Sequence, residues 1–163
     1  WNGETRFPYT ATDNDNLASA PATATIEVTR QNDAPIANDD RGAVPEGSTL
    51  TVLANNGLIA SSLAPLGKDS DAEGDRLTIV AIRTGEKTGT GTPGNVDTPL
   101  VGTHGQLTVH DDGSYTYTAT DDSLAAGATT TDTFTYTISD GQGGTDTAEL
   151  VITITGTGSI ITF

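Results

Sequence analysis

Two stretches of the chain repeat with nearly the same long spacing. Residues 7–13 resemble residues 134–140, with Phe7 corresponding to Phe134, 127 residues later. Each stretch is followed by a segment that alternates apolar and polar residues, 25–29 in one case and 151–155 in the other, now 126 residues apart. Similarity at a fixed long period is typical of chains that copy one structural unit in series.

The repeat predicts one complete module that carries the end of another before it. Residues 1–29 hold only the last two strands of a module, because their counterparts lie in the last hairpin of the second copy. The predicted divisions are residues 1–29 for the last two strands of a preceding repeat, 30–35 for a linker, 36–157 for the complete module and 158–163 for a tail.

The chain is strongly acidic, with 22 Asp and Glu against 7 Lys and Arg and a formal net charge of −15. Such a polyanion repels nucleic acid and anionic membrane surfaces, and it attracts hard cations. No apolar stretch approaches the length of a membrane span, so we expect neither nucleic-acid binding nor membrane insertion. Cys is absent. Outside the cell, stability would therefore have to come from a source other than disulfides, and bound metal is one.

Short runs in which apolar residues alternate with Thr and Ser predict an all-β fold. Seven or so strands with frequent turn signals indicate a Greek-key β-sandwich of immunoglobulin or cadherin type. The clearest strand cores are residues 50–53, 77–82, 106–110, 114–118, 134–138 and 150–154.

Two connections stand out between these strands. Asp111, Asp112 and Gly113 suit a tight hairpin turn, because Gly readily adopts the positive φ that such turns need. The Gly- and Thr-rich stretch 84–99 is either a long loop or an extra hairpin. Phe134, Tyr136 and Ile138 alternate with polar residues, as do three apolar residues of the last strand, so all six are expected to face one core.

Carboxylates gather in two loops, residues 68–75 and 140–144, which this strand order places at the end where the linker enters the sandwich. Like charges held a few ångströms apart need a counter-charge. Calcium takes six to eight oxygen ligands and supplies it. The spacing of Asp69, Asp71 and Glu73 resembles an EF-hand loop, but Val80 stands at the twelfth position and a strand follows, which excludes that motif. The predicted calcium ligands are Asn32, Asp33, Asp69, Asp71, Asp75 and Asp140, with Glu46, Glu73 and Asp13 as further candidates.

Several motifs in order resemble the VCBS and bacterial cadherin-like repeats. The motifs are residues 105–117, 124–127 and 132–146 and the linker Asn-Asp-Ala-Pro at 32–35. The resemblance implies an extracellular β-sandwich repeat of a large RTX-type bacterial adhesin or biofilm protein, exported by type I secretion, with calcium at module junctions. It also implies that Asn32, Asp33, Asp69, Asp71 and Asp140 are junction ligands.

The same resemblance places Glu46, from Val44-Pro45-Glu46, at the far end of the module. There the chain departs from the family pattern, because Gly158 and Ser159 stand where the family usually continues with Asn-Asp. A calcium site at that end is therefore in doubt.

The leading hypothesis is a non-catalytic spacer whose junction calcium stiffens the chain between neighbouring repeats. A second is binding of cell-surface glycans by stacking on aromatic residues. The candidates are Trp1, Tyr9, Tyr115, Tyr117 and Tyr136, although the later tyrosines alternate into the core. A third is a filament in which residues 1–29 complete a like subunit by strand donation. Enzymatic activity is not expected, because His104 and His110 are isolated in the sequence and there is no Cys nucleophile.

Overall fold

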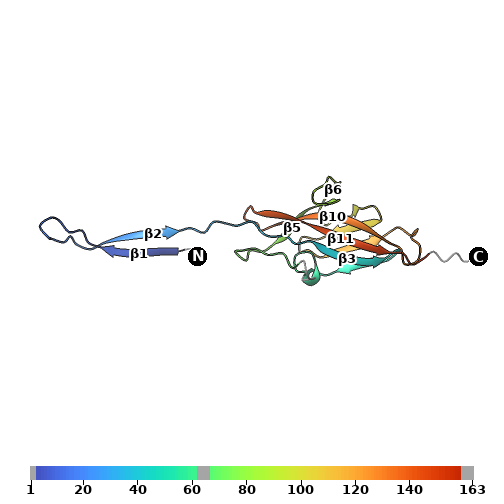
Figure 1. Cartoon of the computed structure of the whole chain (residues 1–163), viewed down its shortest axis with the longest axis horizontal. Helices are drawn as coiled ribbons and strands as arrows, with labels where there is room; N and C mark the ends of the chain where they lie inside the picture. The colour runs from blue at the N-terminus through green and yellow to red at the C-terminus, as the bar shows by residue number, and fades with distance from the viewer. Residues whose placement is uncertain (1–2, 62–66, 159–163) are drawn as a thin grey trace, which may run out of the picture. The chain divides into compact units, whose positions relative to one another are not determined.

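The computed structural model describes residues 3–61 and 67–158 and divides the chain into two compact units, Trp1–Asn32 and Asp33–Phe163. The predicted all-β class is confirmed, since the described residues form strands and a single three-residue 3-10 helix, Ala54–Asn56. Trp1 and most of the predicted tail, residues 159–163, lie outside the described residues. Figure 1 shows the strands of each unit.

The first unit is one antiparallel hairpin of β1 (Gly3–Tyr9) and β2 (Ala22–Val28). Its register reproduces that of the last hairpin in the second unit. The equivalent pairs are Phe7 with Ala24 and Phe134 with Leu150, and Tyr9 with Ala22 and Tyr136 with Ala148. The sequence repeat is therefore also a structural repeat, and its one-residue change in spacing falls in the loop of the hairpin.

The second unit is a sandwich of two sheets. One sheet has the order β3-β11-β10-β5-β6 and the other the order β4-β9-β8-β7. All pairings are antiparallel except that of β3 with β11, which is parallel. The strands are β3 (Asp40–Pro45), β4 (Thr49–Val52), β5 (Thr78–Thr84), β6 (Pro93–Gly94), β7 (Leu100–Val101), β8 (Gly105–Val109), β9 (Tyr115–Ala119), β10 (Thr129–Ser139) and β11 (Thr145–Thr155).

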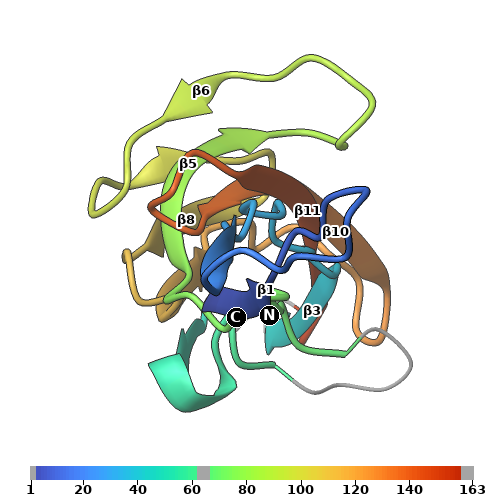
Figure 2. The same cartoon turned by 90° about the vertical axis from the view of Figure 1, so that its left-hand side faces the viewer.

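The stretch 84–99 forms a short extra hairpin. After a loop, β6 turns back and pairs with β5 at the edge of its sheet, and Figure 2 shows it outside β5. The chain then continues to β7, which pairs with β8 in the other sheet. This segment therefore connects the edges of the two sheets.

The core lies between the sheets, and the six apolar residues predicted to share it do so. Phe134, Tyr136, Ile138, Leu150, Ile152 and Ile154 are all at most 1% exposed. The ring of Tyr117 from the opposite sheet meets that of Phe134 edge-on, with centroids 6.2 Å apart. The β8–β9 turn also forms as predicted, with Gly113 at a φ of +82°. Burial of this alternating set fixes the register of both long strands, because a slip by one residue would expose all of it.

Candidate functional site

The segment that enters the sandwich, residues 33–38, lies between the loops that follow β4 and β10. Its backbone donors are taken up by carboxylate and carbonyl oxygens from the loop 69–75 and from Asp146. The bonds run from the amide of Asp33 to Glu73 Oε2 (3.0 Å), from Ile36 to the Ser70 carbonyl (2.8 Å), from Ala37 to Asp146 Oδ2 (2.8 Å) and from Asn38 to Asp69 Oδ1 (2.7 Å). Acidic side chains therefore hold the entering chain against the sandwich.

Two of the predicted ligands shape their own loops. Asp71 Oδ1 accepts hydrogen bonds from the amides of Glu73 (2.8 Å) and Asp75 (3.0 Å). Asp140 Oδ1 binds its own loop in the same way, through the amides two and four residues later, at 2.7 and 3.0 Å. Such side-chain-to-backbone bonds are why Asp is favoured in tight loops.

Asp13 makes the same loop in the first unit. Its Oδ1 accepts from the amides of Asp15 and Leu17, both at 2.9 Å. Asp13 is thus the structural counterpart of Asp140, as their positions in the sequence repeat indicate. It lies in the loop of the β1–β2 hairpin and belongs to a different unit from the other acidic loops.

Two carboxylate oxygens at the entrance, Asp69 Oδ2 and Asp71 Oδ2, are buried without a hydrogen-bond partner among the described residues. Burying an ionised oxygen that has no partner is costly. Asp69 is 5% exposed, and burial raises its pKa from 3.8 to about 7. The charges of Asp40 and Asp146 add to the rise, and the Asn38 amide and the Tyr136 hydroxyl oppose it. A positive charge beside either oxygen would reduce this cost.

Asp40 and Asp146 belong to the same acidic end, although neither was predicted. Asp40 is 4% exposed and accepts a hydrogen bond from the Tyr136 hydroxyl at 2.9 Å. Burial raises its pKa to about 6, against the lowering effect of hydrogen bonds from Ser61 and Tyr136. Asp146 holds the Ala37 amide. Its position six residues after Asp140 on the same hairpin is the signal that could have identified it.

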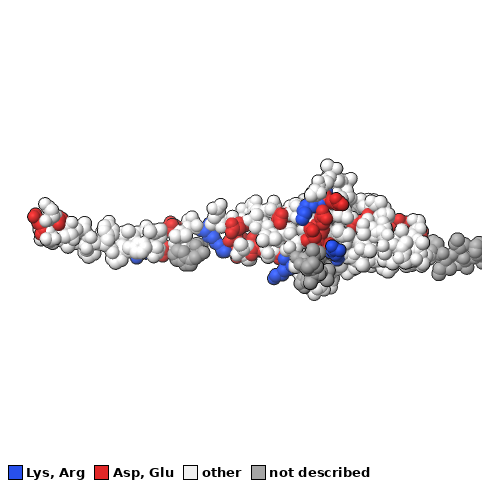
Figure 3. Space-filling model, in the orientation of Figure 1, with Lys and Arg blue, Asp and Glu red and all other residues white. Residues whose placement is uncertain are grey.

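Most of the predicted calcium ligands lie at this end of the second unit, and Figure 3 shows Asp and Glu side chains near it. Asp33, Asp69, Asp71, Glu73, Asp75 and Asp140 all lie in or beside the two loops, whereas Asn32 belongs to the first unit. Among the described residues, no three carboxylate or imidazole side chains converge closely enough to hold an ion by themselves. The donor set therefore fits calcium only with backbone carbonyl, amide or water oxygens completing the six to eight ligands that the ion takes.

Glu46 lies at the other end of the sandwich and is 7% exposed. Its Oε1 accepts hydrogen bonds from the amides of Thr157 (2.8 Å) and Gly158 (3.2 Å) and from the Thr157 hydroxyl (3.1 Å). Its Oε2 accepts one from the Leu124 amide at 3.1 Å. These bonds, led by that of the Thr157 amide, lower the pKa of Glu46. Unlike Asp69 and Asp71, Glu46 has both oxygens occupied, and it fixes the segment that follows β11.

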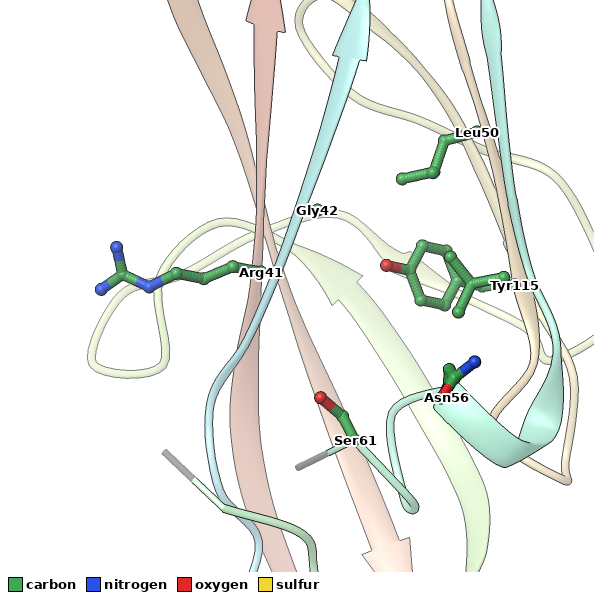
Figure 4. Close-up of a pocket in the computed structure, with 7 residues that line it drawn as sticks. Arg41, Gly42, Leu50, Asn56, Ser61 and Tyr115 are labelled. Carbon is green, nitrogen blue, oxygen red and sulfur yellow. The ribbon is translucent and has the colours of Figure 1, made fainter. Parts of the chain in front are cut away.

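A pocket of about 270 Å³ opens between β3 and β4, and Figure 4 shows the Tyr115 hydroxyl directed toward β3 within it. Gly42 permits this approach, because a Cβ there would lie 3.1 Å from that hydroxyl and 2.6 Å from Ile152 Cδ1. The lining residues are Arg41, Gly42, Leu50, Val52, Asn56, Ser61 and Tyr115. None is a carboxylate, but Ser61 hydrogen-bonds to Asp40, so the pocket adjoins the acidic end.

The aromatic and histidine candidates are mostly engaged inside the fold. Tyr115, Tyr117 and Tyr136 are at most 4% exposed, as their alternation predicted, and cannot stack on a glycan; Tyr9 is 56% exposed. The sequence suggested that His104 is isolated, but the structure shows two hydrogen-bond partners for it. It bonds through its two ring nitrogens to Asp121 and Thr130, each at 2.9 Å, and so ties three segments together. His110 bonds to Asp97.

A two-sheet sandwich with β3 parallel to β11, and with acidic loops around the entering chain, defines the class of cadherin-like domains. The family model of the bacterial cadherin-like domain matches residues 32–156, and the chain belongs to this family. Its domains are typical of bacterial surface and adhesin proteins and are generally non-catalytic. A search of curated proteins finds no match. The described part of the chain contains no helix with the length and hydropathy needed to cross a membrane.

Proposed function

We propose that this chain is a non-catalytic, extracellular spacer of a bacterial adhesin or biofilm protein, and that calcium at the entrance of the second unit stiffens its linker. In this proposal residues 36–157 are a complete repeat and residues 1–29 the last two strands of the repeat before it. The observation that carries the calcium site is the pair of buried, unpartnered oxygens on Asp69 and Asp71.

The mechanism follows from the bonds of the entering segment. Carboxylates of Asp69, Glu73 and Asp146 already hold its amides, and their mutual repulsion opposes this arrangement. A divalent cation bound to the same loop would cancel that repulsion and reduce the freedom of the linker. Extracellular calcium modules bind at about 10⁻⁴–10⁻³ M, so the joint would be stiff outside the cell and loose in a calcium-poor cytosol.

Calorimetric titration with calcium tests the site directly. We expect saturable binding, and stabilisation by about 2.7 kcal/mol when free calcium is about a hundredfold above Kd. Asp71→Asn should abolish both effects, because it neutralises one of the unpartnered oxygens while keeping a loop acceptor. The matched control is Asp121→Asn, in the loop after β9 at the end of the sandwich that holds Glu46. Absence of binding to the unaltered chain at millimolar calcium would refute the site.

Binding of surface glycans has less support, because the described tyrosines of the second unit are buried. Tyr9 alone among the described tyrosines is exposed, and it belongs to a hairpin face whose other members are Phe7, four aliphatic residues of β2, Thr5 and Gly3. That face is better explained as a surface for another part of a protein.

A further inference from the structure

One face of the β1–β2 hairpin is apolar and open. The register places Phe7, Tyr9, Ile26 and Val28 on the same face. Ala24 lies opposite Phe7, Ala22 opposite Tyr9 and Thr5 opposite Ile26. Phe7 is 50%, Tyr9 56%, Ile26 49% and Val28 39% exposed. A two-stranded hairpin is at best marginally stable in water by itself. This face therefore needs a cover.

The second unit contains the same face in a covered state. By the register of the two hairpins, Phe7 and Tyr9 correspond to Phe134 and Tyr136, and Ile26 and Val28 to Ile152 and Ile154. The four counterparts are at most 1% exposed, in one core with residues of β8 and β9. Figure 2 shows β10 and β11 packed into the body of the second unit. The sheet β4-β9-β8 is what covers this face there.

We infer that the open face of the β1–β2 hairpin is an interaction surface for a second sheet built like β4-β9-β8, supplied in cis by the same polypeptide. The inference rests on the repeat architecture in the proposed function and is independent of calcium. A second copy of the chain is the weaker candidate. Its own β4-β9-β8 sheet is already covered by its own last hairpin, whose core residues Ile152 and Ile154 are fully buried.

Two differences between the hairpins specify the partner sheet further. Ala24 stands where the second unit has Leu150, so the partner should carry a larger apolar side chain opposite it to avoid a cavity. Thr5 stands where the second unit has Asp132, whose carboxylate accepts a hydrogen bond from the Tyr117 hydroxyl at 2.7 Å. The partner therefore needs no buried tyrosine hydroxyl at that place.

A fusion of this chain with itself tests the inference. Residues 33–129 are placed before residue 3, so that Gly3 takes the position of Thr130 and the first hairpin is offered a sheet of the right kind. Hydrogen exchange of the β1 and β2 amides should slow at least about a hundredfold relative to the unaltered chain, because exchange would then require opening of a packed core. Binding of a dye for exposed apolar surface should fall.

Two variants of the fusion make the result specific. Ala24→Leu should slow exchange further, since it fills the space that Leu150 occupies in the original sheet. Ile26→Asp should restore fast exchange, because it places a charge in the new core. If the hairpin amides stay as labile as in the unaltered chain, both with and without Ala24→Leu, the inference is wrong. Concentration-dependent dimers of the unaltered chain with protected hairpin amides would also overturn it, in favour of a second copy.

Discussion

Neutralising Asp69 should stabilise the metal-free protein at neutral pH and abolish its response to calcium. Asp69 is almost fully buried; its Oδ1 accepts the Asn38 amide and its Oδ2 has no partner. The ionised side chain therefore destabilises the folded state when no cation is present. Asp69→Asn keeps the Oδ1 acceptor and removes the charge.

The size of the effect follows from the pKa of Asp69, which burial raises from 3.8 to about 7. Because the folded chain binds this proton more tightly than the unfolded chain, the contribution of Asp69 to stability is greatest below about pH 4 and is lost as pH rises to about 7. At about 1.4 kcal/mol for each pKa unit, the loss is at most about 4 kcal/mol. A buried amide N–H without an acceptor costs about 1–3 kcal/mol, so we expect Asp69→Asn to gain about 1–3 kcal/mol above pH 7.

Urea denaturation at about pH 5 and about pH 8, with chelator and with calcium, measures both effects. The unaltered protein in chelator should be less stable at the higher pH, and calcium should restore stability there. The matched control is Asp40→Asn. This substitution removes the charge of a second buried carboxylate, whose pKa is raised to about 6. Asp40 is not a proposed calcium ligand, so calcium should still stabilise this variant. The reasoning fails if Asp69→Asn lowers stability in chelator at about pH 8, or if it leaves the response to calcium intact.

Three further changes have defined outcomes. Glu46→Gln should speed hydrogen exchange of the two amides that Glu46 binds beyond β11 by about tenfold or more, because it removes a charged acceptor. The change should be equal with and without calcium, and a calcium-dependent change would contradict this. Gly42→Ala should cost about 1–3 kcal/mol in urea denaturation, since the added Cβ would lie 2.6 Å from Ile152 Cδ1, and unchanged stability would show that the core yields there. Asp132→Ala should lower the melting temperature markedly. Asp132 is 3% exposed, and its loss leaves two backbone amides and a tyrosine hydroxyl without an acceptor. A shift of only a degree or two would be inconsistent with that role.

Strands that bury one alternating face could be predicted, and strands held mainly by their neighbours could not. Phe134 and Tyr136 predict β10, because every second residue of that stretch is large and apolar. In β3 the buried side chains are Asp40 and Val44, and the position of Gly42 between them has no room for a side chain. That pattern has no apolar alternation, so β3 becomes recognisable only through its parallel pairing with β11. β6 has two residues, one of them Pro93, and no local signal at all.

The residues of the acidic end could likewise be predicted only in part from the sequence. Asp69 and Asp71 could be predicted as ligand candidates because carboxylates are dense in their loop, but the sequence could not show which oxygens are left without partners. Asp40 joins this end only because Tyr136 from another strand places its hydroxyl on it. Asp146 does so because the entering chain passes within hydrogen-bonding distance. Both contacts depend on pairings between segments far apart in the sequence. The only local signal is the position of Asp146 six residues after Asp140 on the same hairpin.

The two ends of the sandwich differ in whether their buried carboxylate oxygens have hydrogen-bond partners. This difference affects how a joint between repeats would respond to calcium. A buried anionic oxygen without a partner, as on Asp69 and Asp71, is stabilised by an added cation, and Asp69→Asn tests this directly. An anion that already accepts four hydrogen bonds, as Glu46 does, gains little from one. Calcium should therefore act on the segment that enters the second unit and leave the segment beyond β11 unaffected. In an array of such repeats, the calcium dependence of each joint would then be set by the repeat that follows it.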